Sequence, residues 1–300
     1  KRATPPRRDG QGGIGFDWVG AVLSSAAVTA FLLSMTNAHR LGWSSPPIVV
    51  GLGVAVLLLI VFVQWERSVP DPMLDLGLFR SRLFSMGVSA RFLSFLGSSA
   101  TFFLMPFYLI QILDYPASHA GLLMVPGSIS LAVMGPLAGR LSDRIGTRWL
   151  AVLGLVLSAS AMITFSRLDA ASSSLHVVLG MLLSGTGAGR VSSANTSASM
   201  SARGRDRYGV VAALLSVTRT TASVTGVATA TTIVAIAMAA AGYAPSLGEI
   251  AEEGGRGIVL AFTTGMGRAF IVATGLVLVA LVLSILRGES ERALSDKETS

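Results

Sequence analysis

Long apolar runs alternate along the chain with short polar segments. The runs reach about 18 residues or more, and most of them lack the polar face that a soluble helix needs. They therefore predict helices that span a membrane. Eight runs fit this description, at residues 18–36, 48–65, 83–113, 121–138, 149–166, 175–198, 208–241 and 268–286. We expect an all-α polytopic membrane protein with eight transmembrane helices.

Two segments differ from a plain apolar span. Segment 67–82 combines prolines, which forbid a continuous helix, with apolar residues that suit a membrane interface. In the seventh run, Ala222, Gly226 and Ala230 form a small-xxx-small pattern that lets helices approach closely.

The share and the positions of charged residues indicate the class of protein and the orientation of the chain in the membrane. Charged residues make up 13% of the sequence, against roughly 25% in soluble proteins. The net charge of +7 does not favour a nucleic-acid partner, because the basic residues punctuate the spans and form no stripe with interleaved aromatics. With both termini in the cytoplasm, most of the 23 Lys and Arg residues fall on the cytoplasmic side. We therefore expect a multi-pass protein of the plasma (cytoplasmic) membrane.

One break between spans, residues 139–148, is unusually charged. Its glycines permit a sharp turn and its arginines favour the cytoplasm, so the segment predicts a tight hairpin loop. An ordinary basic cytoplasmic loop is the alternative. The residues that define the motif are Gly139, Arg140, Asp143, Arg144, Gly146 and Arg148.

Several polar residues lie inside the predicted spans. Arg91 is nine residues beyond Arg82, or about 14 Å along a helix, where a charge costs about 2.5–3.5 kcal/mol. Such a residue should face the bundle interior, a water-filled cavity or an anionic partner; alternatively it snorkels to the headgroups. The same two interpretations apply to Arg219. The predicted substrate and coupling cavity contains Arg91, Ser94, Ser98, Arg190, Asn195 and Arg219.

The sequence offers no constellation for catalysis. His39, His119 and His176 all lie in loops or at span ends, and no paired acids or metal-ligand cluster occur inside the spans. The chain contains no cysteine, which excludes disulfides and thiolate metal sites. We expect neither an enzyme nor a metal site.

The pattern Gly-x-Leu-x-Asp-Arg-x-Gly-x-Arg in residues 139–148 resembles the hairpin signature of the major facilitator superfamily of transporters. Segments 72–82, 107–109, 121–148 and 208–228 resemble, in order and spacing, the fourteen-span drug:proton antiporter branch of that superfamily. The resemblance extends from about residue 17 to residue 287.

The resemblance implies a domain organisation. It assigns a cytoplasmic basic linker, a two-span central hairpin, a cytoplasmic interfacial segment, a carboxy-terminal six-helix bundle and a cytoplasmic tail, at residues 1–16, 17–66, 67–82, 83–287 and 288–300. It also implies a missing amino-terminal six-helix half, because the substrate cavity of such transporters lies between two halves.

The resemblance further implies proton-coupled export of amphipathic drugs or antibiotics by alternating access. The partners would be a small amphipathic substrate and membrane lipid, with a proton gradient as the energy source and no cofactor. Contacts of the hairpin motif would latch one conformation. Asp114, Ile110 and Arg190 depart from the pattern and leave the substrate class open. The alternatives are a narrow-specificity metabolite exporter and a non-transporting sensor or assembly subunit.

Overall fold

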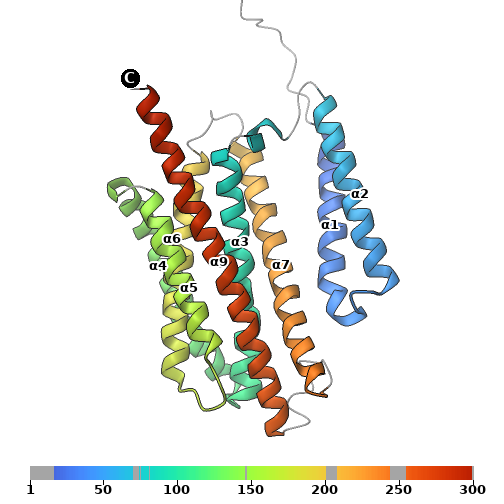
Figure 1. Cartoon of the computed structure of the whole chain (residues 1–300), viewed down its shortest axis with the longest axis vertical. Helices are drawn as coiled ribbons and strands as arrows, with labels where there is room; N and C mark the ends of the chain where they lie inside the picture. The colour runs from blue at the N-terminus through green and yellow to red at the C-terminus, as the bar shows by residue number, and fades with distance from the viewer. Residues whose placement is uncertain are drawn as a thin grey trace, which may run out of the picture.

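The computed structural model describes residues 17–69, 74, 76–80, 82–145, 147–200, 208–243 and 255–298, and every regular element among them is helical (Figure 1). The eight long helices are α1 (Trp18–Leu41), α2 (Pro46–Ser68), α3 (Arg82–Phe107), α4 (Ala117–Ile145), α5 (Thr147–Ser166), α6 (Ser174–Met200), α7 (Tyr208–Ala240) and α9 (Arg256–Glu298). A 3₁₀ helix, η1 (Leu76–Arg80), precedes α3, and a π-helical turn, η2 (Tyr108–Ile112), extends it beyond Pro106.

The expected all-α membrane fold is confirmed. Among the described residues, seven helices are long and apolar enough to cross a membrane, and the eighth, α6, has a shorter apolar stretch over Ser174–Gly189. Helix α6 packs against both α4 and α5. Its glycines permit this: a Cβ on Gly185 would collide with the backbone of Gly127 in α4, and one on Gly187 would lie 2.7 Å from the carbonyl oxygen of Gly154 in α5. Helix α6 therefore packs closely on a protein neighbour on each of two sides.

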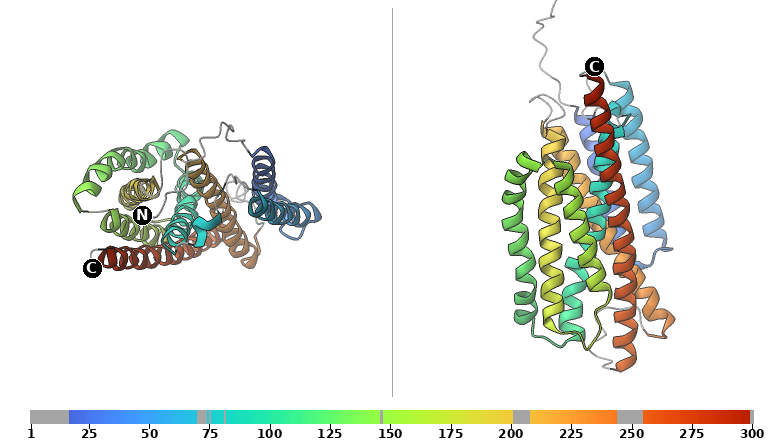
Figure 2. Two further views of the ribbon diagram at one scale, coloured as in Figure 1. Left: turned by 90° about the horizontal axis from the view of Figure 1, so that it is seen from above. Right: turned by 60° about the vertical axis from the view of Figure 1, so that its left-hand side comes forward.

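The helices form two groups of unequal size. Helices α3, α7 and α9 pack on one another, α5 joins α9 to α6, and α4 packs on α6. The hairpin of α1 and α2 stands beside this bundle and contacts it through α1 and α7 (Figures 1 and 2). The predicted two-span hairpin and six-helix bundle are recognisable in this arrangement.

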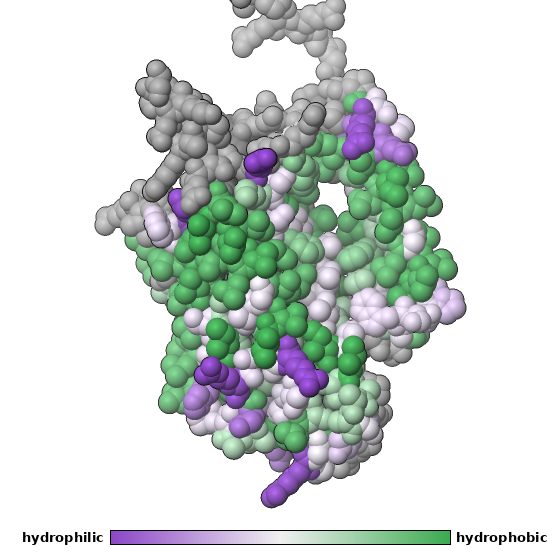
Figure 3. All heavy atoms as spheres, in the orientation of Figure 1, coloured by the Kyte–Doolittle hydropathy of each residue, from purple (hydrophilic) through white to green (hydrophobic). Residues whose placement is uncertain are grey.

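The surface matches a lipid environment. In Figure 3 broad hydrophobic areas cover the middle of the visible face, while hydrophilic residues gather toward its two ends. Helix α2 is one example of such an apolar surface: Val49, Val56, Leu57 and Ile60 are all at least half exposed. In water such a surface would be unfavourable, whereas lipid tails solvate it well.

The main hydrophobic core joins η2 and the adjoining end of α3 to α5, α6, α7 and α9. Its largest fully buried side chains include Tyr108, Phe165, Phe262 and Phe270, and the rings of Phe165 and Phe270 are 5.3 Å apart. The Tyr108 hydroxyl donates a hydrogen bond to the Asp169 carbonyl oxygen at 2.7 Å. The bundle is therefore tightly packed at the end where α3 terminates and α9 begins.

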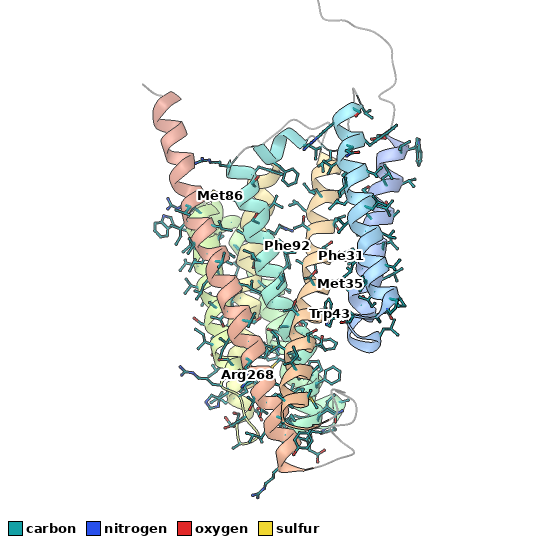
Figure 4. All side chains as sticks on the ribbon, turned by 45° about the vertical axis from the view of Figure 1, so that its right-hand side comes forward. Phe31, Met35, Trp43, Met86, Phe92 and Arg268 are labelled. Atoms are coloured by element: carbon teal, nitrogen blue, oxygen red, sulfur yellow. The ribbon has the colours of Figure 1, made fainter. Side chains whose placement is uncertain are left out.

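Specific hydrogen bonds join α1 to α2 and join this two-helix hairpin to α7. At one end, the Asp17 carboxylate caps α1 by accepting from Gly20 N (2.8 Å) and from Trp65 Nε1 of α2 (3.0 Å). At the other end, Trp43 Nε1 donates to Thr232 Oγ1 of α7 at 2.9 Å. Figure 4 shows Phe31, Met35 and Trp43 on the side of the hairpin that faces α7.

Two sequence expectations about helix ends were wrong. Residues 139–148 do not form a tight loop: α4 continues past Gly139 to Ile145, and α5 begins at Thr147. The last helix begins at Arg256 rather than near residue 268. Arg268 lies exposed on the surface of that helix and does not mark its boundary (Figure 4).

Candidate functional site

A cavity of about 450 Å³ lies between α3, α4, α6 and α7. Its volume lies within the range of small-molecule sites in proteins. Helix α3 supplies most of the wall, α7 packs beside it and adds three lining residues, and α4 and α6 add one each. The lining residues are Ser94, Phe95, Ser98, Ser99, Phe102, Phe103, Leu131, Ala188, Arg219, Ser223 and Val227.

The lining combines apolar walls with a few polar groups. Phe95, Phe102 and Phe103 are the large apolar residues that α3 contributes. Serine hydroxyls provide most of the polar groups, and among them Ser99 Oγ donates to the Leu96 carbonyl oxygen at 2.8 Å. An apolar cavity with a few convergent polar groups is typical of a site that binds a small organic molecule.

The two intramembrane arginines of α3 and α7 meet at one aromatic ring. The guanidinium of Arg91 lies 5.3 Å from the ring centroid of Phe95, and that of Arg219 lies 5.6 Å from the same centroid. Because both guanidiniums lie near the same ring, the two charges sit at one level of the bundle.

The two arginines differ in exposure. Arg91 is only 8% exposed, and its Nε and Nη1 atoms have no hydrogen-bond partner among the described residues. Its guanidinium lies over Phe95, one turn further into the span, which is the opposite of snorkelling toward the near end. Arg219 is exposed and lines the cavity directly. The cavity wall therefore carries one accessible cation, Arg219, and a second, buried cation, Arg91, lies against Phe95 outside the lining.

Close packing of α3 on α7 sets the geometry of the cavity. A Cβ on Gly226 would collide with the Ser99 hydroxyl and with the Leu96 carbonyl oxygen. Ala222 and Ala230, one turn away on either side, are buried. The small residues at this spacing let the two backbones approach, as their pattern predicts.

The structure brings together part of the predicted cavity. Ser94, Ser98 and Arg219 line it, and Arg91 adjoins it through Phe95. Arg190 and Asn195 lie on α6, but their side chains are outside the described residues. Ala188 of the same helix does line the cavity. The role of each of these residues stays a prediction.

The hairpin motif lies away from the cavity, where α4 ends and α5 begins. Arg148 Nη2 donates to the Ile285 carbonyl oxygen of α9 at 3.1 Å, and its guanidinium lies 5.7 Å from the Trp149 ring. Arg140 is exposed and Gly139 is partly buried, whereas the side-chain environment at Asp143, Arg144 and Gly146 lies outside the described residues. Arg148 therefore connects the start of α5 to the last helix.

Sequence reasoning missed the aromatic part of the site. Phe95 was not predicted, although its position four residues after Arg91 places the two side chains on one helix face. Phe102 and Phe103 resemble ordinary lipid-facing residues in the sequence, so nothing local distinguishes them. The contribution of Leu131 and Ala188 depends on how α4 and α6 pack, which one-dimensional periodicity does not encode.

Polar side chains form hydrogen bonds at the end of the bundle that is remote from Arg91 and Arg219. Beside the Tyr108 contact, the Tyr115 hydroxyl lies 2.8 Å from Ser174 Oγ. The pKa of the Asp169 carboxyl is below its ordinary value, because Ser172 Oγ and the Ala171 N–H donate to it. Within the described part of the chain no group of three potential metal ligands occurs.

Comparison with known proteins places this architecture in a family. The family model described as Major Facilitator Superfamily matches residues 5–227. This match covers more than half of the 300 residues, and the chain therefore belongs to the major facilitator superfamily.

Several relatives carry names that refer to drug resistance. The chain is 29% identical over 163 residues to "Lincomycin resistance protein LmrB" of Listeria monocytogenes, covering 54% of this chain and 35% of that protein. It is 29% identical over 213 residues to "Multidrug resistance protein Stp" of Mycobacterium tuberculosis, covering 71% and 40%. "Uncharacterized transporter YebQ" of Escherichia coli is 30% identical over 218 residues, covering 73% and 46%. The chain spans less than half the length of these three relatives.

A solved structure shares the fold. The bacterial homologue of the human lysosomal transporter Spinster, in an inward-facing and occupied conformation, superposes with a TM-score of 0.57 over 90% of this chain and 65% of that one. The sequence identity is 19%, so the likeness concerns the fold alone.

Proposed function

We propose that the chain forms the carboxy-terminal wall of a proton-coupled exporter that carries small amphipathic compounds by alternating access. The cavity between α3, α4, α6 and α7 is the observation that carries this proposal, because it offers aromatic walls, hydroxyls and a cation within a bundle of apolar, membrane-spanning helices. Names of relatives that refer to lincomycin and multidrug resistance support an antibiotic or drug as substrate.

The proposed transporter needs a second wall. Such transporters bind substrate between two six-helix halves, and the chain spans less than half the length of the three relatives compared above. We infer that a missing amino-terminal half completes the cavity. In the same proposal the protein lies in the cytoplasmic membrane with both termini of this chain inside.

The first test is efflux of a fluorescent amphipathic dye from cells that express the full-length gene encoding this chain. Cells that express only residues 1–300 provide the comparison. The proposal expects efflux from the full-length protein and none from the isolated chain, since one wall cannot alternate access alone. If neither protein exports any dye although both are inserted, a narrow metabolite exporter or a non-transporting sensor or assembly subunit becomes the better account.

A further inference from the structure

The charges of the six-helix bundle do not balance within its spans. Arg91 and Arg219 lie inside the spans of α3 and α7, whereas the sequence from 76 to 288 places every Asp and Glu in a segment between spans. The carboxylates in question are Asp114, Asp143, Asp169, Asp206, Glu249, Glu252 and Glu253. No span of this bundle therefore contains a carboxylate that could neutralise the two arginines.

The contacts present stabilise these cations only in part. Both guanidiniums lie near Phe95, at 5.3 and 5.6 Å from its centroid, and one aromatic ring is a weak partner for two like charges. Arg91 also has two buried nitrogen atoms without a hydrogen-bond partner in the described residues. Water in the cavity or an anion from outside these spans would supply the missing hydrogen-bond partners.

The cavity is shaped to receive such an anion together with an apolar body. Arg219 lines it and is exposed, so its planar guanidinium can bind a carboxylate with two parallel hydrogen bonds. The hydroxyls of Ser94, Ser98 and Ser223 lie in the same lining, as further donors. Phe102 and Phe103 provide an apolar surface beside these polar groups.

We propose that this cavity selects amphipathic acids: molecules with an aromatic or aliphatic body and one carboxylate, bound by Arg219 with Arg91 adding charge behind Phe95. This inference rests on the proposed function, since it names the substrate class of that same cavity. Arg219 would touch the substrate, whereas Arg91 would act as a positioning residue through Phe95.

The test is equilibrium binding of three matched fluorescent probes to the purified full-length protein in detergent. The probes are 4-(1-pyrenyl)butyrate, its neutral amide and the corresponding amine, which share one apolar body and differ in charge at pH 7.5. We expect the acid to bind at least about 10-fold more tightly than the amide, and the amine more weakly still.

Variants assign the effect to the two arginines. Arg219→Gln should remove the preference of acid over amide, and Arg91→Gln should reduce it. Arg91→Lys should retain most of it, and retention would show that the charge at this site matters independently of any folding defect caused by the loss of a buried arginine. Arg268→Gln is the matched control, because it removes an exposed arginine of α9 that does not line the cavity.

The outcomes separate this inference from the proposed function. Equal binding of acid and amide would overturn the inference, and would mean that a carboxylate of the missing half already neutralises the arginines. Tighter binding of the amine, or an equal effect of Arg268→Gln, would overturn it too. A protein that exports cationic dyes but shows no preference for the acid retains the proposed function alone. Selective binding of the acid without any efflux supports the inference and contradicts the proposed function.

Discussion

At the scale of single residues, Arg91 is a buried cation whose Nε and Nη1 atoms have no hydrogen-bond partner among the described residues. It is 8% exposed, lies inside a span and relies on the Phe95 ring, whose attraction for a desolvated cation amounts to about 2 kcal/mol. The cost of an arginine at this depth is about 2.5–3.5 kcal/mol or more. Burying Arg91 therefore costs more free energy than its contact with Phe95 contributes. We infer that Arg91 serves the function of the protein and not the packing of the bundle.

Replacing Arg91 tests that role. We expect Arg91→Ala in the full-length protein to lower dye efflux about 10-fold or more while the protein still reaches the membrane in normal amount, because the bundle loses an unsatisfied charge rather than a packing contact. Initial efflux rates normalised to membrane protein are the measurement. Arg268→Ala should leave both quantities unchanged, and wild-type rates in Arg91→Ala would contradict the assignment.

The sequence predicts residue types of the site better than their partners. The cost of charge in lipid made Arg91 and Arg219 candidates, and helical spacing added Ser94 and Ser98. That both arginines share Phe95 could not be predicted, because the rotation of α7 against α3 is fixed only by tertiary packing.

At the scale of elements, the contact between α3 and α7 holds the cavity in shape. Gly226 lies against Ser99 and Leu96 so closely that even a methyl group does not fit. Within the membrane the hydrophobic effect does not drive helices together, so this kind of close van der Waals contact contributes much of their association.

Enlarging Gly226 should therefore separate the two helices. We predict that Gly226→Leu destabilises the bundle by about 1–3 kcal/mol or more, because the side chain must displace the backbone of α3. The midpoint of thermal unfolding in detergent should fall by several degrees. Gly275→Leu on α9 is the control, since a Cβ there meets no atom within 4 Å. An equal fall in the unfolding midpoint of both variants would show that the α3–α7 contact has no special role in stability.

Element boundaries show where sequence reasoning fails. Positions of spans follow from apolar length, and all eight predicted runs correspond to helices. The ends do not follow, because charged residues were taken as helix ends at residues 139–148 and near Arg268. Helices can continue beyond the lipid or carry an exposed arginine, and α4 continues even through Pro126 and Pro136.

At the scale of the whole molecule, the proposed function needs two halves that move relative to each other. The hairpin motif belongs to this scale, since Arg148 joins α5 to the carbonyl oxygen of Ile285 on α9. Such contacts can favour one conformation over another without touching the substrate.

Asparagine has nearly the same size and shape as aspartate, so Asp143→Asn removes the charge of this motif residue and changes little else. We predict that Asp143→Asn impairs transport while membrane insertion stays intact, because a latch contributes to switching and not to folding. Efflux per inserted molecule is the readout. Normal transport by this variant in the full-length protein would contradict the latch.

Orientation is a second property of the whole molecule. The chain contains no cysteine, so single cysteines can report on its topology. In a full-length background without other cysteines, Ala171→Cys should react with a membrane-impermeant maleimide in intact cells, and Glu298→Cys should react only after lysis. The reverse pattern would place the termini outside.

We propose that a proton gradient drives export through the cavity that this chain helps to form. Dye uptake into everted membrane vesicles containing the full-length protein, before and after a protonophore collapses the gradient, tests this proposal. We expect gradient-dependent uptake that stops on collapse and is greatly reduced in Arg91→Ala. Uptake that continues after collapse, or that is the same in Arg91→Ala as in the wild type, would contradict the proposal.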